Sequence, residues 1–189
     1  MYVREWNNLQ YASAAAYLLA VYSDYLSAAN AKLNCPDGLV QPQGLLDFAR
    51  SQVMIKSSQE TENFSRSFQS GNRGFPLQAD YILGKNRQGM SYVVGYGPKY
   101  PIRVHHRGSS IPSIFAQRSS VSCVQGFDSW YRRSQGDPNV IYGALVGGPD
   151  ENDNYSDDRS NYEQSEPTLS GTAPLVGLFA KLYGGSLGN

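Results

Sequence analysis

The chain has 189 residues, enough for the core of one domain, and its 16 basic and 16 acidic side chains leave no formal net charge. This balance argues against a nucleic-acid-binding protein, which would carry a basic excess. No run approaches the ~20 apolar residues of a membrane span, and the first residues lack the hydrophobic run and small-residue cleavage site of a signal peptide.

Helical periodicity is strongest near the start of the chain. Apolar residues at helical spacing in an alanine-dense segment predict a helix over residues 6–22. Residues 35–38 follow as a loop, and a second helix is expected over 44–52. The two cysteines, Cys35 and Cys123, match no metal-binding spacing, and the sequence leaves open whether they pair.

The amino-acid composition changes in the middle of the chain. Residues 53–78 are rich in polar side chains and poor in aliphatic ones, which is typical of an exposed loop or a disordered insert. Helical character resumes at 79–84, and residues 85–140 then alternate glycine, proline and aromatic residues. The only strand-like alternation is short, at 91–94. Long ordered loops within a domain usually carry function.

The C-terminal third predicts two further helical segments. Residues 162–166 can begin a helix, but Pro167 interrupts it. A last helix is expected at 173–183, with Pro174 in its first turn and two glycines after its end. The expected architecture is therefore all-α, with helices joined by long loops.

Two adjacent histidines lie in the long loops. Neighbouring side chains point in different directions, so at most one of His105 and His106 faces a given site. Zinc would need three or four ligands at suitable spacing, and the sequence has no other histidine, so we expect no metal site and no cofactor. Considered in isolation, such a histidine more often caps a loop than binds a ligand.

The acidic stretch at residues 150–166 allows three interpretations. A carboxylate beside Arg159 would stay ionised, whereas one beside the nearby tyrosines would be pushed toward its protonated form. Glycoside hydrolysis by general acid–base catalysis requires such a difference. The alternatives are a solvated turn and a calcium-binding structural domain, although the glycine and glutamate of an EF-hand loop are not in register here.

Two long gapped motifs run through the second half of the chain. The first consists of Ser91, Val93, Val94, Gly97, Lys99, Val104, His105 and Arg107, and the second of Tyr155, Asp157, Tyr162, Glu166 and Thr168. Both resemble the signatures of glycoside hydrolase family 9, in the form that plant endoglucanases carry. At one position the family pattern has Asn and this chain has Thr172. The resemblance covers nearly all of the chain except residues 53–78.

The resemblance implies a fold, a reaction and a location. The chain would be the C-terminal part of a catalytic domain over residues 1–189, with an atypical insert at 53–78. Its fold would be part of an (α/α)6 barrel with long active-site loops. Its partner would be a cellulose-like β-1,4-glucan, cleaved internally with inversion of configuration, and its location would be extracellular, at the cell wall.

The same resemblance assigns roles to residues of the site. It places Glu166 as the catalytic acid, Asp157 as the carboxylate that supports the acid, and His105 as the histidine that binds sugar in the cleft. Three further residues are expected on the substrate-binding side of this site, namely Arg107, His106 and Tyr162. The family carries its catalytic base on an Asp-Ala-Gly-Asp motif, which this sequence lacks. The alternative is therefore a non-catalytic glucan-binding fragment, or the product of a mistaken gene model.

Overall fold

The computed structural model describes residues 2–52 and 80–184, and the predicted insert at 53–78 lies outside them. The described elements are α1 (Asn8–Ala28), β1 (Leu33–Cys35), β2 (Gly38–Val40), α2 (Pro42–Gln52), α4 (Asp80–Leu83), α5 (Arg107–Ser110), α6 (Cys123–Gln125), the π-helix η1 (Gly126–Tyr131), α7 (Tyr162–Ser165) and α8 (Leu169–Gly184). Regular structure in these residues is mostly helical, as predicted.

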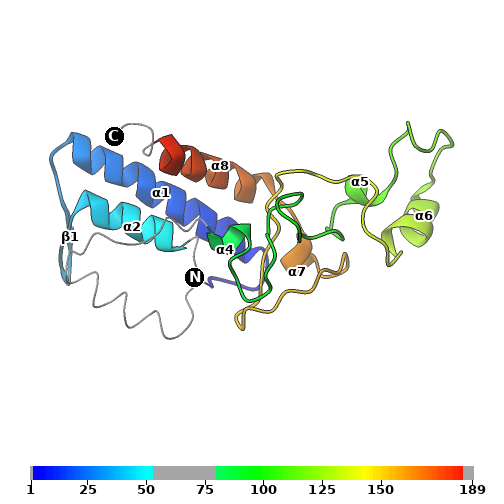
Figure 1. Cartoon of the computed structure of the whole chain (residues 1–189), viewed down its shortest axis with the longest axis horizontal. Helices are drawn as coiled ribbons and strands as arrows, with labels where there is room; N and C mark the ends of the chain where they lie inside the picture. The colour runs from blue at the N-terminus through cyan, green and yellow to red at the C-terminus, as the bar shows by residue number, and fades with distance from the viewer. Residues whose placement is uncertain (1, 53–79, 185–189) are drawn as a thin grey trace.

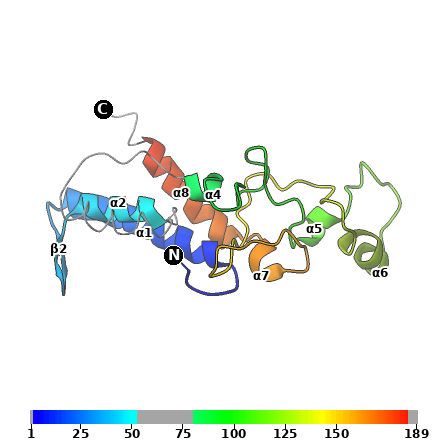
Figure 2. The ribbon, with the colours of Figure 1, turned by 60° about the horizontal axis from the view of Figure 1, so that its bottom comes forward.

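The three long helices form one end of an elongated molecule, and the loops form the other (Figures 1 and 2). Helix α1 packs against both α2 and α8. Small side chains recur on its buried face, where Ala12, Ala16 and Ala20 are almost completely shielded from solvent. Alanine favours the helix and lets neighbouring helices approach closely, so the dense alanine of the sequence is explained by packing.

Helix α1 is longer than the sequence predicted. It continues to Ala28, although Ser23 and Asp24 interrupt the apolar pattern after residue 22. Ser23 is buried and its hydroxyl donates a 2.7 Å hydrogen bond to the carbonyl of Pro42 at the start of α2. Asp24 forms an ion pair of 2.5 Å with Lys181 of α8. The two polar residues therefore fasten α1 to its neighbours instead of ending it.

The β structure differs from the prediction. Strands β1 and β2 pair antiparallel around residues 36–37, with Leu33 opposite Val40. Each strand has three residues, which is too short for an alternating pattern to be recognised. The segment 91–94 contributes only a single bridge, between Val93 and Leu145.

Helix α8 begins earlier than expected, at Leu169, so the prediction that Pro174 lies in the first turn is wrong. The hydroxyl oxygen of Thr168 accepts a 3.1 Å hydrogen bond from the amide of Gly171, which is the capping contact that starts a helix. Pro174 lies inside the helix. A threonine at this position is itself a sequence signal for the start of a helix, and the prediction that relied on Pro174 did not use it.

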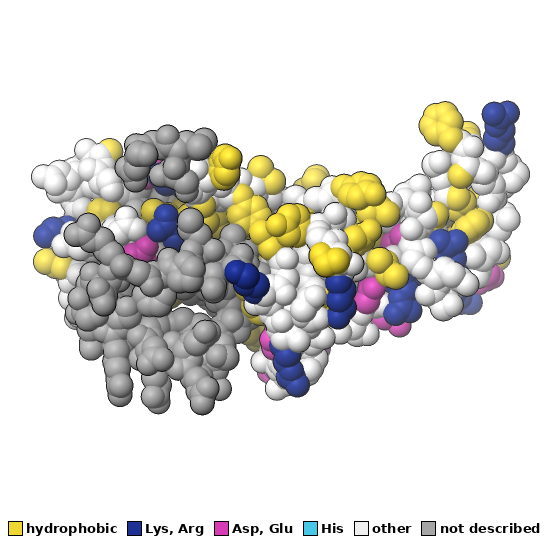
Figure 3. Space-filling model, viewed as in Figure 1, with side chains coloured by type: hydrophobic (Ala, Val, Ile, Leu, Met, Phe, Trp, Pro, Cys, Tyr) yellow, Lys and Arg dark blue, Asp and Glu magenta, His cyan; other side chains and the backbone are white. Residues whose placement is uncertain are grey.

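The loop half of the molecule is organised around its own buried side chains. Tyr92, Val104 and Val146 are at most 1% exposed and belong to one hydrophobic cluster with residues of the long helices. On the face seen in Figure 3, hydrophobic side chains gather where the helices meet the loops. Cys35 and Cys123 are both free thiols. Within residues 2–52 and 80–184, no helix is both long enough and apolar enough to cross a bilayer.

Candidate active site

Glu166 stands directly after α7, at the point where Pro167 ends the helix. Its backbone is extended, with φ −77° and ψ 121°, as the steric demand of a following proline requires. Its amide donates a 3.1 Å hydrogen bond to the carbonyl of Tyr162. The predicted interruption of the helix at residue 167 is confirmed, and Glu166 is half-buried just beyond the end of α7.

The carboxylate of Glu166 contacts the beginning of the chain. The indole Nε1 of Trp6 donates a 2.9 Å hydrogen bond to Glu166 Oε2. The side-chain amide of Asn7 donates a 3.3 Å hydrogen bond to the Glu166 carbonyl, and the Asn7 backbone amide donates a 2.8 Å bond to the carbonyl of Glu163. Asn7 is only 1% exposed. The segment before α1 therefore holds α7 and the residue that follows it.

His105 lies beside this segment, because its amide donates a 3.0 Å hydrogen bond to the carbonyl of Ser165. Its Nδ1 is 2.8 Å from the carbonyl oxygen of Arg159 and 2.9 Å from the hydroxyl oxygen of Tyr131. A carbonyl oxygen can only accept, so Nδ1 carries a proton. In the neutral ring Nε2 is then an acceptor, and it has no hydrogen-bond partner among the described residues.

Two tyrosine rings flank the imidazole of His105. Tyr131 meets it edge-on with ring centroids 5.8 Å apart, and its hydroxyl donates a 2.9 Å hydrogen bond to the Arg159 carbonyl. Burial raises the pKa of the Tyr131 hydroxyl above its ordinary value. Tyr162 lies 5.8 Å from the imidazole on a tilted plane and is 50% exposed. Sequence reasoning missed Tyr131, which lies in a π-helix far from both motifs.

Asp157 binds the backbone that leads to His105. Its Oδ2 accepts a 3.0 Å hydrogen bond from the amide of Ile102, and its Oδ1 accepts one of 3.0 Å from the amide of Arg103. No hydrogen bond joins Asp157 to Glu166 in the part of the chain that the structure describes. Asp157 therefore fastens the segment that carries His105, and its role in supporting the acid stays a prediction.

The carboxylate partner of Arg159 is Asp137, which lies outside the acidic stretch, so the expected pairing within that stretch is wrong. The two side chains are 3% and 4% exposed and lie 2.7 Å apart. The remaining guanidinium nitrogens donate to three backbone carbonyls of the loop at residues 131–135. Asp137 also accepts 3.0 Å hydrogen bonds from the amide of Val104 and the hydroxyl of Ser109. Sequence reasoning missed Asp137, because a lone Asp before proline looks like an ordinary turn residue.

The other residues expected on the substrate side have local partners. His106 is exposed, and its Nδ1 accepts a 3.1 Å hydrogen bond from the amide of Ser109, which caps α5. The guanidinium of Arg107 lies over the ring of Phe127, 4.7 Å from its centroid, and 5.8 Å from that of Tyr131. His106 therefore caps α5 by accepting from a backbone amide, and a substrate contact from either residue stays a prediction.

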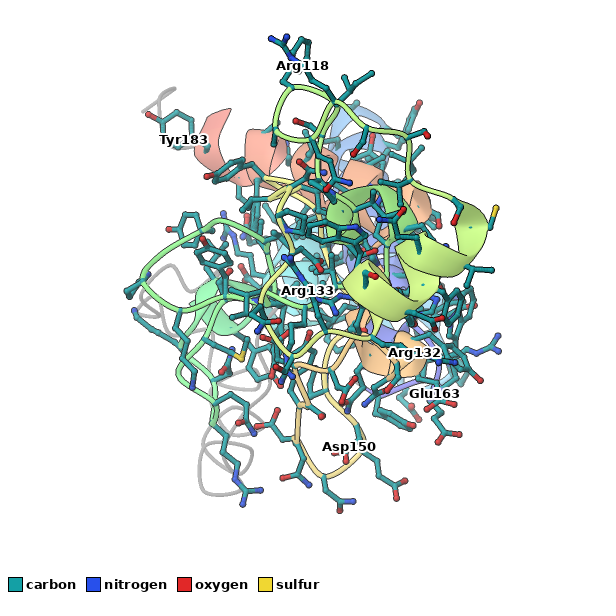
Figure 4. The ribbon with its side chains drawn as sticks, turned by 90° about the vertical axis from the view of Figure 1, so that its right-hand side faces the viewer. Arg118, Arg132, Arg133, Asp150, Glu163 and Tyr183 are labelled. Carbon is teal, nitrogen blue, oxygen red and sulfur yellow. The ribbon has the colours of Figure 1, made fainter. Side chains whose placement is uncertain are left out.

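The acidic residues near the site remain dispersed. Asp158 is exposed, and hydrogen bonds from the amide and the hydroxyl of Ser160 lower the pKa of its carboxyl group. Glu163 lies at the edge of the molecule, on the outer side of α7 (Figure 4). Over residues 2–52 and 80–184, no group of three or more His, Cys, Asp or Glu side chains could hold a metal ion. The calcium-binding interpretation thus gains no support from the geometry.

The chain is similar to proteins of one family of glycoside hydrolases. The sequence model of Glycosyl hydrolase family 9 matches residues 1–179. Endoglucanase 5 of Arabidopsis thaliana is 86% identical over 189 residues, which are 100% of this chain and 26% of that protein. Endoglucanase 13 of Oryza sativa subsp. indica is 52% identical over 182 residues, 96% of this chain and 25% of that protein.

A solved structure gives the same result. The cellulase Cel9M of C. cellulolyticum in complex with cellobiose matches with a TM-score of 0.61 at 28% identity, over 98% of this chain and 30% of that one. The chain spans about a quarter of the length of the curated relatives it matches. The family match extends over nearly the whole chain and includes both gapped motifs. The chain therefore belongs to glycosyl hydrolase family 9.

Proposed function

We propose that the protein carrying this chain is an endoglucanase that cleaves β-1,4-glucan with inversion, and that this chain supplies the acid side of its active site. The observation that supports this most directly is the placement of Glu166, whose carboxylate is held on one oxygen by Trp6 and whose neighbour Ser165 binds the backbone of His105. The relatives are called endoglucanases, and the neighbouring cellulase structure contains cellobiose.

In this mechanism Glu166 begins the reaction as a neutral carboxylic acid. Its proton passes to the glycosidic oxygen while the bond from that oxygen to the anomeric carbon breaks, and the bonding electrons stay on the oxygen. A water molecule attacks the anomeric carbon from the opposite face and gives its proton to a base carboxylate roughly 6.5–9.5 Å from the acid. After one cleavage Glu166 is a carboxylate and the base is a carboxylic acid.

The base must come from elsewhere in the protein. The Asp-Ala-Gly-Asp motif is absent from the 189 residues, and we place the base in the part of the relatives' length that this chain does not span. We likewise propose that α1, α2 and α8 form part of an (α/α)6 barrel, and that the protein acts outside the cell, at the cell wall.

His105 and Tyr162 would hold the sugar next to the acid. The free Nε2 of His105 can accept a hydrogen bond from a sugar hydroxyl, since its Nδ1 is occupied by Arg159 and Tyr131. The half-exposed ring of Tyr162 offers a face for the apolar C–H side of a pyranose. Arg107 and His106 would contribute at the rim, and Asp157 would keep the His105 segment in place.

The test compares the intact protein with its Glu166→Gln variant on soluble β-1,4-glucan. Loss of the acid should lower turnover by about 10²- to 10⁴-fold, because an amide cannot donate the required proton. Glucan binding should persist, since Gln keeps the shape of the side chain. Proton NMR of the first products should show the α-anomer. Full turnover by the variant, or a β-anomeric first product, would overturn the proposal, and binding without turnover by the unaltered protein would indicate a glucan-binding role.

A further inference from the structure

The carboxylate of Glu166 is held asymmetrically. Oε2 accepts the 2.9 Å hydrogen bond from Trp6 Nε1, whereas Oε1 receives no hydrogen bond from any residue that the structure describes. The donor comes from a residue 160 positions earlier in the chain. The contact is therefore tertiary, and it distinguishes the two oxygens of one carboxyl group.

The chemistry of the donor decides what this asymmetry means. An indole N–H can donate but cannot accept, so the oxygen that faces it must present a lone pair. When Glu166 is protonated, its carbonyl oxygen is a better acceptor than its hydroxyl oxygen, so the hydrogen bond from the indole favours the acid that carries its proton on Oε1. Trp6 therefore biases the acidic proton toward Oε1 and leaves Oε2 as the carbonyl oxygen that accepts from the indole.

We propose that Trp6 is the positioning residue of the catalytic acid, directing the proton of Glu166 onto Oε1 and fixing the direction in which it is delivered. This inference rests on the proposed role of Glu166 as the acid. It adds a residue outside both family motifs to the machinery of the reaction, and it assigns the two carboxyl oxygens different tasks.

Trp6 is itself held in place, as a positioning residue must be. The guanidinium of Arg4 lies 5.5 Å from the centroid of the Trp6 ring and 5.6 Å from that of Tyr11. Arg4 also donates a 3.2 Å hydrogen bond to the Tyr11 hydroxyl. The next residue, Asn7, adopts a left-handed backbone with φ 56° and ψ 46°, which asparagine tolerates better than most residues. Its hydrogen bonds to residues 163 and 166 hold the start of α1 against α7.

The chain contains its own matched control. Trp130 is the second of only two tryptophans. Its indole Nε1 is buried and has no hydrogen-bond partner within residues 2–52 and 80–184, while the guanidinium of Arg133 lies 5.0 Å from its ring centroid. Trp130→Phe thus removes an indole N–H that holds nothing, whereas Trp6→Phe removes one that binds the acid.

The first experiment needs no activity. In the intact protein labelled with ¹⁵N-tryptophan, the Trp6 indole resonance is assigned by its loss in Trp6→Phe. We expect this resonance to move as the acid titrates, the movement to vanish in Glu166→Gln, and the Trp130 resonance to remain still. An indole resonance of Trp6 that ignores pH, or that moves equally in Glu166→Gln, would overturn the contact.

The second experiment measures turnover of two glucan substrates, one with a poor and one with a very good leaving group. Trp6→Phe should slow the poor leaving group roughly 10- to 100-fold, a part of the effect of general acid catalysis, and spare the good one. Trp130→Phe should affect neither. A benzothienylalanine at residue 6 keeps the indole shape without its N–H. If Trp6→Phe folds poorly, this replacement should still show the selective loss of turnover with the poor leaving group.

The outcomes separate this inference from the proposed function. If Glu166→Gln abolishes turnover but the variants at residue 6 slow both substrates equally, or neither, Glu166 remains the acid and the positioning role of Trp6 is refuted. If Glu166→Gln turns over normally, the proposed function itself fails.

Discussion

Replacement of Asp137 by asparagine should be among the most damaging single changes in the loop half. Its carboxylate accepts hydrogen bonds from the Arg159 guanidinium at 2.7 Å, the Val104 amide at 3.0 Å and the Ser109 hydroxyl at 3.0 Å. Both partners of the ion pair are at most 4% exposed. Asp137→Asn leaves the arginine charged and without a counter-charge in a place that water does not reach.

The magnitude follows from the burial of the pair. Removing one partner of a buried ion pair typically costs about 3–5 kcal/mol in the free energy of unfolding. The exposed pair of Asp128 and Arg132, at 3.0 Å and with both side chains more than half exposed, is a matched control. Asp128→Asn should cost at most about 1 kcal/mol, because solvent screens the interaction.

Urea denaturation of both variants checks this difference. We expect a much lower midpoint for Asp137→Asn and a nearly unchanged one for Asp128→Asn. Glucan binding should weaken with the first variant as well, since the carbonyl of Arg159 holds the imidazole of His105. Equal midpoints for the two variants would refute the reasoning that the buried pair fastens the loops around the site.

Three smaller changes test other contacts of the site. A Cβ at Gly147 would collide with a carbonyl oxygen of α7, so Gly147→Ala should lower the free energy of unfolding by about 1–3 kcal/mol. The control is Gly136→Ala, where the nearest atom is 3.4 Å from the added Cβ and the free energy of unfolding should stay unchanged. Equal thermal midpoints for the two variants would contradict the predicted collision at Gly147. Thr172→Val removes the acceptor of a backbone amide at 3.1 Å and should cost about 1–3 kcal/mol, which a urea midpoint equal to that of the unaltered protein would disprove. Ser160→Ala should raise the depressed pKa of Asp158 toward 3.8, as followed by carboxyl NMR. The stability that comes from the lowered pKa is present above the unfolded-state pKa and is lost as the pH falls through the folded-state pKa. An unchanged titration of Asp158 in the variant would exclude the Ser160 hydroxyl as a cause of the lowered pKa.

The long helices could be predicted because their evidence is local. Spacing of apolar residues marks α1 and α2, and a proline marks the end of α7. The errors concern positions where tertiary contacts override a local signal. Ser23 and Asp24 lie just beyond the predicted end of α1, yet α1 continues through them and both are bonded to neighbouring helices. Thr168 caps α8, whose first residue lies four positions before the start that Pro174 suggested.

The two gapped motifs pointed to the proposed acid and histidine, whereas the contacts that hold these residues could not be predicted. Trp6 reaches Glu166 across 160 residues of chain, and no periodicity reports such a contact. Asp137 and Tyr131 are single residues in irregular loops, where neither spacing nor composition distinguishes a buried ion pair from an exposed turn. Their roles follow from the folded geometry of the backbone carbonyls around them.

The central claim is that Glu166 delivers a proton to the leaving group and that His105 binds the sugar. Measuring kcat for substrates of graded leaving-group ability separates the two roles in the intact protein. Glu166→Gln should lose about 10²- to 10⁴-fold with poor leaving groups and be partly spared with very good ones, which need little protonation. His105→Ala should bind all substrates more weakly and slow them alike. Equal losses in both variants with the best leaving group would contradict the assignment of the acid to Glu166 and direct attention to Glu163.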